Sequence, residues 1–231
     1  MRLAAHQPQY MPWLGYFDKM ARADRFVLLD TVQYKKNEWQ NRNRIRTASG
    51  WQWITVPVRY RFPMRIRDVA IDPTSPWRRK QGAALRQSYA AAPYRDAILP
   101  LLDALLTRPI DDLATLNLES VRLLARLLEV RTPVVLASTI DGIPEGADER
   151  LIALCRSLGC DTYLAGQGGH GYMDLDLWRR AGVRVEFQDF HHPVYPQCHA
   201  GFEACLSAID LLMQRGTGAA AVLRGAFPRA A

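Results

Sequence analysis

The stretch His6-Gln7-Pro8-Gln9-Tyr10-Met11-Pro12-Trp13-Leu14-Gly15-Tyr16-Phe17 decides the fold because of what stands on either side of it. A short apolar run, 3–5, precedes it, and a helix-like segment, 18–23, and a second apolar run, 26–30, follow it. This order predicts a strand, a polar loop, a helix and a second strand, as at the start of a parallel α/β sheet. Ligands bind such sheets beyond the carboxyl ends of the strands, so this loop is the first candidate site.

The composition bounds the class of protein. The chain has 231 residues, 48% of them hydrophobic, which is enough for a sizeable core. It has no apolar run of about 18 residues and no signal-peptide pattern at its start, so we expect a cytoplasmic protein without a membrane span. The spacing of Cys155, Cys160, Cys198 and Cys205 matches neither a zinc ribbon nor a redox pair. We therefore expect reduced thiols, with a metal site at Cys198, His199 and Cys205 as the alternative.

The rest of the chain continues the alternation of strands and helices. A hairpin turning at Ser49-Gly50, a short strand over 69–72 and a helical segment over 75–130 come first. Strands over 133–138, 162–166 and 183–187 then alternate with helices over 148–157, 174–181 and 206–215, the last stopped by Gly216. The sequence predicts an α/β fold with a mostly parallel, Rossmann-like sheet, a β-hairpin insertion and a helical middle segment. We expect one domain over 1–216 and a partly loose tail over 217–231.

The net charge of +7 is concentrated in one block. Between residues 35 and 67, Glu38 stands alone against Lys35, Lys36, Arg42, Arg44, Arg46, Arg59, Arg61, Arg65 and Arg67. A basic block with aromatic residues attracts phosphate groups. A nucleic acid, a nucleotide and a nucleotide-linked sugar all remain open as ligands, and a solvated hairpin face is the structural alternative.

The first loop supplies a candidate catalytic residue, His6, and candidate ligand-binding residues, Gln7, Gln9, Tyr10 and Trp13. A histidine that leaves a strand beside a helix start is similar to the arrangement in nucleotidyltransferase-like domains, where helix amides handle phosphates. The paired-histidine HxGH signature of those domains is absent, because the chain has Trp13-Leu14-Gly15-Tyr16 at that place.

Further candidate binding residues follow the second strand. Asp30 stands where a carboxylate often binds a ribose hydroxyl or an ammonium group. Beyond it, Trp39 is predicted to stack on a ring, Arg42 and Arg44 to bind phosphate, and the amides to form paired hydrogen bonds. These amides are Gln40, Asn41 and Asn43.

Two later loops also follow predicted strands. Gly166, Gly168 and Gly169 would let the backbone approach a phosphate, although a flexible turn explains them equally well. His192 and Tyr195 are candidate general acids or bases, and Gln197 is a candidate binding residue. We predict no metal site here, because neighbouring side chains such as those of His191 and His192 point apart on an extended chain. Since parallel strands end at one edge, the four loops are predicted to share a cleft.

These loops resemble the WbqC-like family, in order, from near residue 2 to about Gly216. The matching segments are 6–10, 12–17, Asp30 with 32–34, 39–43, 50–51, 55–58, 163–164 with Gly166, 195–197, Phe202 and 206–212. Departures are Ala165, where the family pattern has Ser, and Gln214-Arg215. The first would remove a hydroxyl contact to a ligand.

The resemblance implies a role in bacterial surface polysaccharide, notably O-antigen, biosynthesis. It suggests a transferase-type enzyme acting on a nucleotide-linked or otherwise phosphorylated amino sugar, with acyl or aminoacyl transfer as one version. It names no cofactor: a nucleotide remains open, and we predict no metal. Two other classes remain open: a non-catalytic subunit of a biosynthetic complex and, less favoured, a nucleic-acid-binding module.

Overall fold

A computed structural model describes residues 1–225 of the chain. The remaining residues, 226–231, belong to the predicted loose tail and lie outside the described residues. The contacts within the chain divide it into two compact units. The sheet unit comprises Met1–Gln7, Asp18–Val32 and Arg131–Phe190, and the hairpin–helix unit comprises Pro8–Phe17, Gln33–Val130 and the chain from His191 onward.

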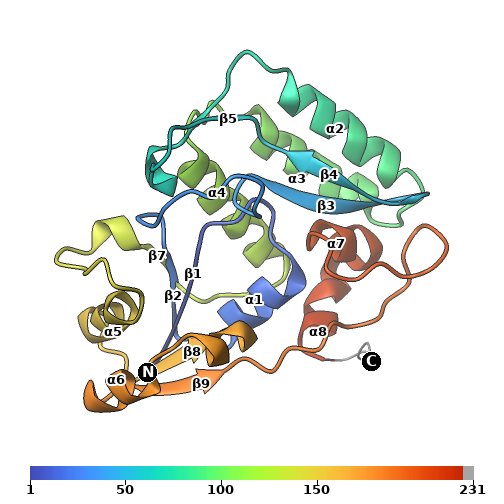
Figure 1. Cartoon of the computed structure of the whole chain (residues 1–231). Helices are drawn as coiled ribbons and strands as arrows, with labels where there is room; N and C mark the ends of the chain where they lie inside the picture. Colours follow the sequence, from blue (N-terminus) through green and yellow to red (C-terminus); the bar gives the residue numbers. More distant parts are fainter. Residues whose placement is uncertain (226–231) are drawn as a thin grey trace. The chain divides into compact units, whose positions relative to one another are not determined.

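The sheet unit is built on five parallel strands (Figure 1), which confirms the predicted fold class. They are β1 (Arg2–His6), β2 (Arg25–Leu28), β7 (Val134–Leu136), β8 (Thr162–Ala165) and β9 (Arg184–Phe187). Their order across the sheet is β7-β2-β1-β8-β9. Numbered by appearance in the chain, this is 3-2-1-4-5, the order of Rossmann-type folds.

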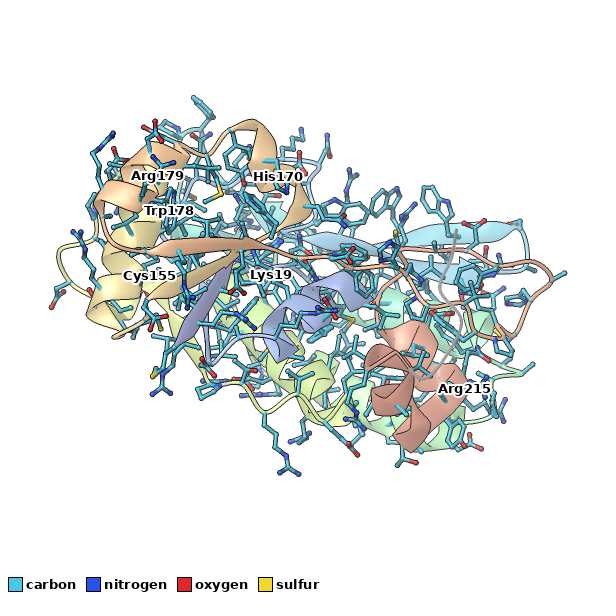
Figure 2. All side chains as sticks on the ribbon, turned by 90° about the horizontal axis from the view of Figure 1, so that it is seen from below. Lys19, Cys155, His170, Trp178, Arg179 and Arg215 are labelled. Carbon is cyan, nitrogen blue, oxygen red and sulfur yellow. The ribbon has the colours of Figure 1, made fainter. Side chains whose placement is uncertain are left out.

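One core of the sheet unit joins the strands to α5 (Ala147–Ser157) and α6 (Leu175–Arg180). Tyr163 of β8 stacks on Trp178 of α6, with ring centroids 4.9 Å apart. The Trp178 indole donates a hydrogen bond of 2.9 Å to Asp148. Cys155 and Cys160 have free thiols and belong to this core, where they pack like small apolar side chains. Figure 2 shows the position of Cys155.

The first helix, α1 (Leu14–Ala21), begins four residues before the predicted start at Asp18. The prediction was wrong here because Leu14, Tyr16 and Phe17 were assigned to a polar loop, whereas all three are fully buried. Burial of a continuous apolar and aromatic run extends the helix back to the residues that follow Pro12 and Trp13.

The hairpin–helix unit contains the predicted hairpin, formed by β3 (Arg42–Thr47) and β4 (Gly50–Thr55). A second antiparallel pair joins β5 (Val58–Arg59) to β6 (Ala70–Ile71), so the strand predicted over 69–72 is shorter than expected. The 3₁₀ turn η1 (Ile66–Asp68) precedes β6. Pro57 lies between β4 and β5, at a strand end as predicted, where its missing N–H costs no ladder hydrogen bond.

The predicted helical middle segment is present as three helices, and the chain ends in two more. They are α2 (Trp77–Ser88), α3 (Arg95–Thr107), α4 (Leu113–Leu127), α7 (Ile209–Arg215) and α8 (Ala219–Leu223). Gly216 ends α7 with a φ of 51°, and a Cβ there would lie 2.3 Å from the Tyr94 ring, so only glycine fits. The first part of the predicted loose tail forms η4 (Gly216–Gly218) and α8. Among residues 1–225, no helix is both long and apolar enough to cross a bilayer.

A strained residue in the first loop is held by hydrogen bonds from two sides. Met11 is fully buried and has a φ of 45°, which costs conformational energy for a residue with a side chain. Its N–H donates to Ser120 Oγ at 3.2 Å, and its carbonyl accepts from Asn43 Nδ2 at 2.8 Å. Asn43 Nδ2 also reaches the Tyr10 carbonyl at 3.2 Å. The Asn43 amide therefore fixes the conformation of this loop.

We expect Asn43→Ala to lower the free energy of unfolding by about 2–3 kcal/mol, because it leaves buried carbonyls without a donor and releases the strained loop. Urea unfolding followed by tryptophan fluorescence measures this change. Gln87→Ala, on the exposed side of α2, is the matched control and should change the value by less than about 0.5 kcal/mol. Equal values for the two variants would contradict this role of Asn43.

Candidate functional site

The strand order reverses between β1 and β8, and this is where open α/β sheets hold their ligands. His6 is the last residue of β1. The glycine-rich turn η3 (Gln167–Gly171) begins directly after β8, with Gly166 as the residue before it. Within the sheet unit, the structure thus brings one predicted catalytic residue and the predicted glycine loop to neighbouring strand ends.

The two ladders of β1 end at different places. Pairing with β2 continues to His6 and Leu28, whereas pairing with β8 stops at Ala4 and Leu164. The carbonyl of Ala5 is bonded instead to the ammonium of Lys19, whose Nζ lies 2.9 Å away. Lys19 comes from α1 and is 5% exposed, and its Nζ lies 5.7 Å from the centre of the Tyr163 ring (Figure 2).

His6 is a neutral imidazole with a defined acceptor nitrogen. Its Nδ1 lies 3.0 Å from the Gln7 carbonyl, so Nδ1 carries the proton and donates, and Nε2 is the acceptor. Burial, with the charge of Lys19 as the second cause, lowers the pKa of His6 from 6.5 to about 4. Burial also lowers the pKa of Lys19 from 10.5 to about 8. At neutral pH the site therefore pairs a neutral base with a mostly charged ammonium.

The glycines after β8 differ in what a side chain at each position would contact. A Cβ at Gly169 would lie 3.2 Å from Phe187, in the packed end of the sheet. A Cβ at Gly166 or Gly168 would meet nothing within 4 Å, and neither residue has a positive φ. Neither packing nor a positive φ thus requires glycine at Gly166 or Gly168, and the close approach of a ligand to their backbone stays a prediction. The exposed His170 ring stacks on Phe187, with centroids 3.4 Å apart.

Asp30 follows β2 and is 1% exposed. Its Oδ1 accepts a hydrogen bond of 2.9 Å from the Ser138 amide, which lies just beyond β7. The carboxylate therefore joins two neighbouring strand-end loops of the sheet unit. Its predicted contact with a ligand stays a prediction.

In the hairpin–helix unit, one face of the β3–β4 hairpin interleaves arginines and tryptophans. Arg42 lies over the Trp53 ring at 4.1 Å, and Arg44 lies 5.3 Å from Trp39 and 5.0 Å from Trp51. The side chains of Trp51 and Trp53 are 41% and 37% exposed. Within residues 1–225 no carboxylate pairs with Arg42 or Arg44. We call these five residues the Arg–Trp face.

Most of the predicted amide contacts are used within the protein. Gln40 accepts from the Lys35 amide at 2.9 Å, and Asn41 donates to the Val56 carbonyl at 2.8 Å. The Tyr10 hydroxyl donates to Gln81 at 2.7 Å, and burial raises its pKa. Gln9 is 8% exposed, and its Oε1 accepts no hydrogen bond from the described residues. Trp13 is half-buried, and a Cβ on Gly15 would lie 2.4 Å from its ring.

The predicted second acid–base pair lies in a buried network of the hairpin–helix unit. The Tyr195 hydroxyl and Gln197 Nε2 both donate to Asp210 Oδ2, at 3.0 and 2.9 Å. Burial raises the pKa of both Tyr195 and Asp210. His192 is also buried, with Nδ1 lying 2.8 Å from the Pro193 carbonyl, and burial lowers its pKa. These partners give Tyr195 and Gln197 a clear structural function, and their catalytic and binding roles stay predictions.

The candidate residues are distributed over both units. His6, Gln7, Asp30 and the three glycines belong to the sheet unit, and the other candidates belong to the hairpin–helix unit. A single cleft shared by all of them stays a prediction. Lys19 was missed by the sequence reading, because it was treated as part of an ordinary helix. The available signal was a lysine between Phe17 and Met20 in a strongly apolar segment.

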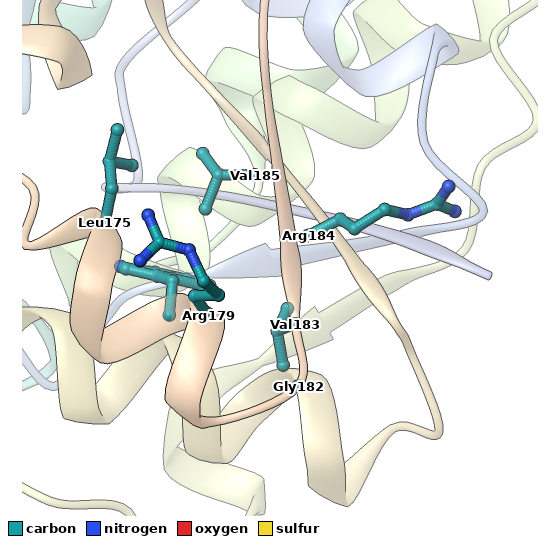
Figure 3. Close-up of a pocket in the computed structure, with 7 residues that line it drawn as sticks. Leu175, Arg179, Gly182, Val183, Arg184 and Val185 are labelled. Atoms are coloured by element: carbon teal, nitrogen blue, oxygen red, sulfur yellow. The ribbon is translucent and has the colours of Figure 1, made fainter.

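A separate hollow of about 420 Å³ lies between α6 and β9 (Figure 3). Leu175, Val183 and Val185 form its apolar lining. It is beside the start of β9, whereas the candidate site lies at the carboxyl ends of the strands. Arg179, which also lines it, is paired with Asp176 at 2.7 Å. None of the candidate site residues lines the hollow. No cluster of three metal-ligating side chains occurs in the described part of the chain.

Comparison with known proteins bears on both units. The model of the WbqC-like protein family matches residues 7–222. The chain belongs to this family. It is 36% identical, over 228 residues, to the uncharacterized protein Rv1507c of Mycobacterium tuberculosis (strain ATCC 25618 / H37Rv), with 96% of this chain and 97% of that protein covered. No solved structure matches the chain. The resemblance seen in the sequence motifs is thereby confirmed.

The family match includes Lys19, the glycine loop and the Arg–Trp face, and His6 stands one residue before it. The match to the WbqC-like family therefore includes parts of both units. It does not by itself name a reaction.

We expect the free energy of unfolding to fall as the pH is lowered from about 6.5 to about 4, because His6 takes up a proton on unfolding in this range. Below about pH 4 both states bind the proton, and the contribution levels off. Since His6 is partly exposed, its contribution is about 1–3 kcal/mol. Urea unfolding across this pH range, for the wild type and His6→Gln, measures it. Identical pH dependences of the two proteins would contradict the lowered pKa.

Proposed function

We propose that this protein is an enzyme of bacterial surface polysaccharide biosynthesis, of the O-antigen type, that acts on a nucleotide-linked or otherwise phosphorylated amino sugar. The observation that carries the proposal is the reversal of strand order between β1 and β8, with His6 on one side and the glycine loop on the other. The WbqC-like family is associated with O-antigen loci, which supports the pathway.

His6 is the proposed general base. Its Nε2 would accept the proton released when the amine or hydroxyl of a sugar attacks the carbonyl carbon of an activated acyl or aminoacyl donor. The bond between that carbon and its carrier then breaks, and the carrier leaves with the electron pair. The neutral state that burial and Lys19 impose supports this role, since a protonated imidazole has no acceptor. The backbone at Gly166 and Gly168 would approach the phosphates, because a side chain at either position would occupy that space.

The hairpin–helix unit supplies the second part of the proposal. A guanidinium stacked on an indole can still donate from its N–H edge to a pair of phosphate oxygens. One nitrogen of each guanidinium is already used, because Arg42 donates to the Asn37 carbonyl and Arg44 to the Cys205 carbonyl, and the other N–H groups are the proposed donors. Arg42 and Arg44 would bind phosphate there, with Trp39 beside a ring of the ligand. His192 and Tyr195 remain proposed as a second acid–base set, secondary to His6 because their described contacts are internal.

The first test uses Gly168→Val and the UDP- and dTDP-linked sugars as probes. The fold tolerates this side chain, because nothing lies within 4 Å of its Cβ, so the melting temperature without ligand should stay near that of the wild type. Binding of the sugar nucleotide should weaken at least tenfold, measured by thermal shift and calorimetry. Gly218→Val, equally open and in the hairpin–helix unit, is the control and should bind as the wild type does. Absence of any binding by the wild type would overturn the proposed function.

The second test separates the enzyme from a nucleic-acid-binding module. Positive charge beside aromatic rings, as in the Arg–Trp face, is also a feature of such modules. Arg44→Gln should weaken binding of a nucleotide sugar about tenfold, whereas the wild type should show no oligonucleotide gel shift at moderate salt. Arg61→Gln removes the same charge at an exposed position outside the face and serves as control. Tight oligonucleotide binding with a steep salt dependence, lost in Arg44→Gln alone, would support the nucleic-acid module instead.

A further inference from the structure

Lys19 is a buried cation that forms no ion pair with a carboxylate among residues 1–225. Its ammonium can donate three hydrogen bonds, and the Ala5 carbonyl is its one acceptor among the described residues. The neighbouring carboxylate of Asp18 is committed elsewhere, to Gln188 at 2.7 Å and to Arg22 at 2.9 Å. No ion pair to Lys19 forms within residues 1–225.

Such an arrangement opposes folding. A buried charge loses its hydration, and a counter-ion or a full set of hydrogen bonds is needed to offset that loss. One carbonyl and the Tyr163 ring, 5.7 Å from Nζ, offset only part of it. If the Ala5 carbonyl merely needed a donor, a neutral amide or a water molecule would serve at lower cost. The charge of Lys19 therefore calls for an explanation outside the stability of the fold.

The position of the ammonium supplies that explanation. In β1 the carbonyls of Arg2 and His6 point toward the β2 side, where they accept from Asp24 and Leu29. The alternating carbonyls, that of Ala5 included, point toward β8. The β1–β8 ladder ends at Ala4, so the Ala5 carbonyl has left the ladder. The ammonium of Lys19 bonds to this carbonyl where the two strands separate, one residue before His6.

We propose that Lys19 is the anion-binding residue of this crevice, and that its ammonium pairs with a phosphate or carboxylate oxygen of the substrate beside His6. The inference deepens the proposed function and rests on it for the identity of the substrate. An anion that reaches Lys19 must enter the parting of β1 and β8, since the side chain is 5% exposed. Its charge would be balanced only in the complex.

The test compares Lys19→Met, which keeps the length of the side chain and removes the charge, with Lys19→Arg and the wild type. Pyrophosphate, acetate and UDP are the probes, and thermal shift and calorimetry are the measurements. Lys80→Met, at an exposed position of α2, controls for the loss of one positive charge. Pyrophosphate carries phosphate oxygens and acetate carries a carboxylate. The probe that binds therefore identifies which anionic group Lys19 recognises.

We expect the loss of charge in Lys19→Met to show in anion binding, which should weaken at least tenfold for the preferred anion. The melting temperature without ligand reflects two opposing changes, the removal of a buried charge and the loss of the donor to the Ala5 carbonyl. Lys19→Arg should keep part of the binding, and Lys80→Met should leave binding and melting temperature unchanged. A purely structural lysine would leave anion binding unchanged in Lys19→Met, and that result would overturn the inference.

The outcomes for the two proposals can be told apart. If the wild type binds pyrophosphate through Lys19 but no sugar nucleotide, the proposed function fails and the anion site stands. If it binds sugar nucleotides equally well as Lys19→Met, the anion site fails and the proposed function stands. If the wild type binds none of the probes, both are overturned.

Discussion

The unequal ladders of β1 are the constraint on which the sheet unit depends. A central strand must bond to both neighbours along its length, yet β1 stays with β2 to His6 and leaves β8 after Ala4. The unpaired Ala5 carbonyl then needs a donor, and α1 provides Lys19. The separation of β1 from β8 thus fixes which carbonyl leaves the ladder and which side chain bonds to it.

The electrostatics of His6 and Lys19 follow from the burial of the two side chains. Low solvation lowers the pKa of both His6 and Lys19, because each is charged when protonated. The two shifts have different consequences at neutral pH: the imidazole is already neutral, whereas the ammonium still carries most of its charge. The ammonium also disfavours a second positive charge on His6. A neutral imidazole and a charged ammonium therefore coexist at the end of β1.

The sequence was sufficient for the order of elements and insufficient for the use of their side chains. Alternating apolar runs and glycine stops predicted the parallel sheet, the hairpin and the end of α7, because these depend on local patterns. The partners of Asn43, Gln197 and Tyr195 depend on contacts between distant segments, which no local pattern contains. The amides predicted to contact a ligand are bonded to the backbone or to Asp210, and their contact with a ligand stays a prediction. Lys19 was missed for the same reason, since its partner is a strand carbonyl.

The basic block shows why counting charges overstates the attraction for polyanions. Arg46 is 2% exposed and donates to the carbonyls of Thr47 and Gly50, so it stabilises the hairpin. Arg59 is paired with Asp72 at 2.9 Å. Arg42 and Arg44 each donate to a backbone carbonyl, and no carboxylate among residues 1–225 pairs with them. They lie over a short pair of strands, against Trp53 and Trp51, whose planes are nearly perpendicular. Such a face suits one ring with an attached anionic group better than a run of stacked bases, which needs repeated parallel platforms and several phosphate contacts.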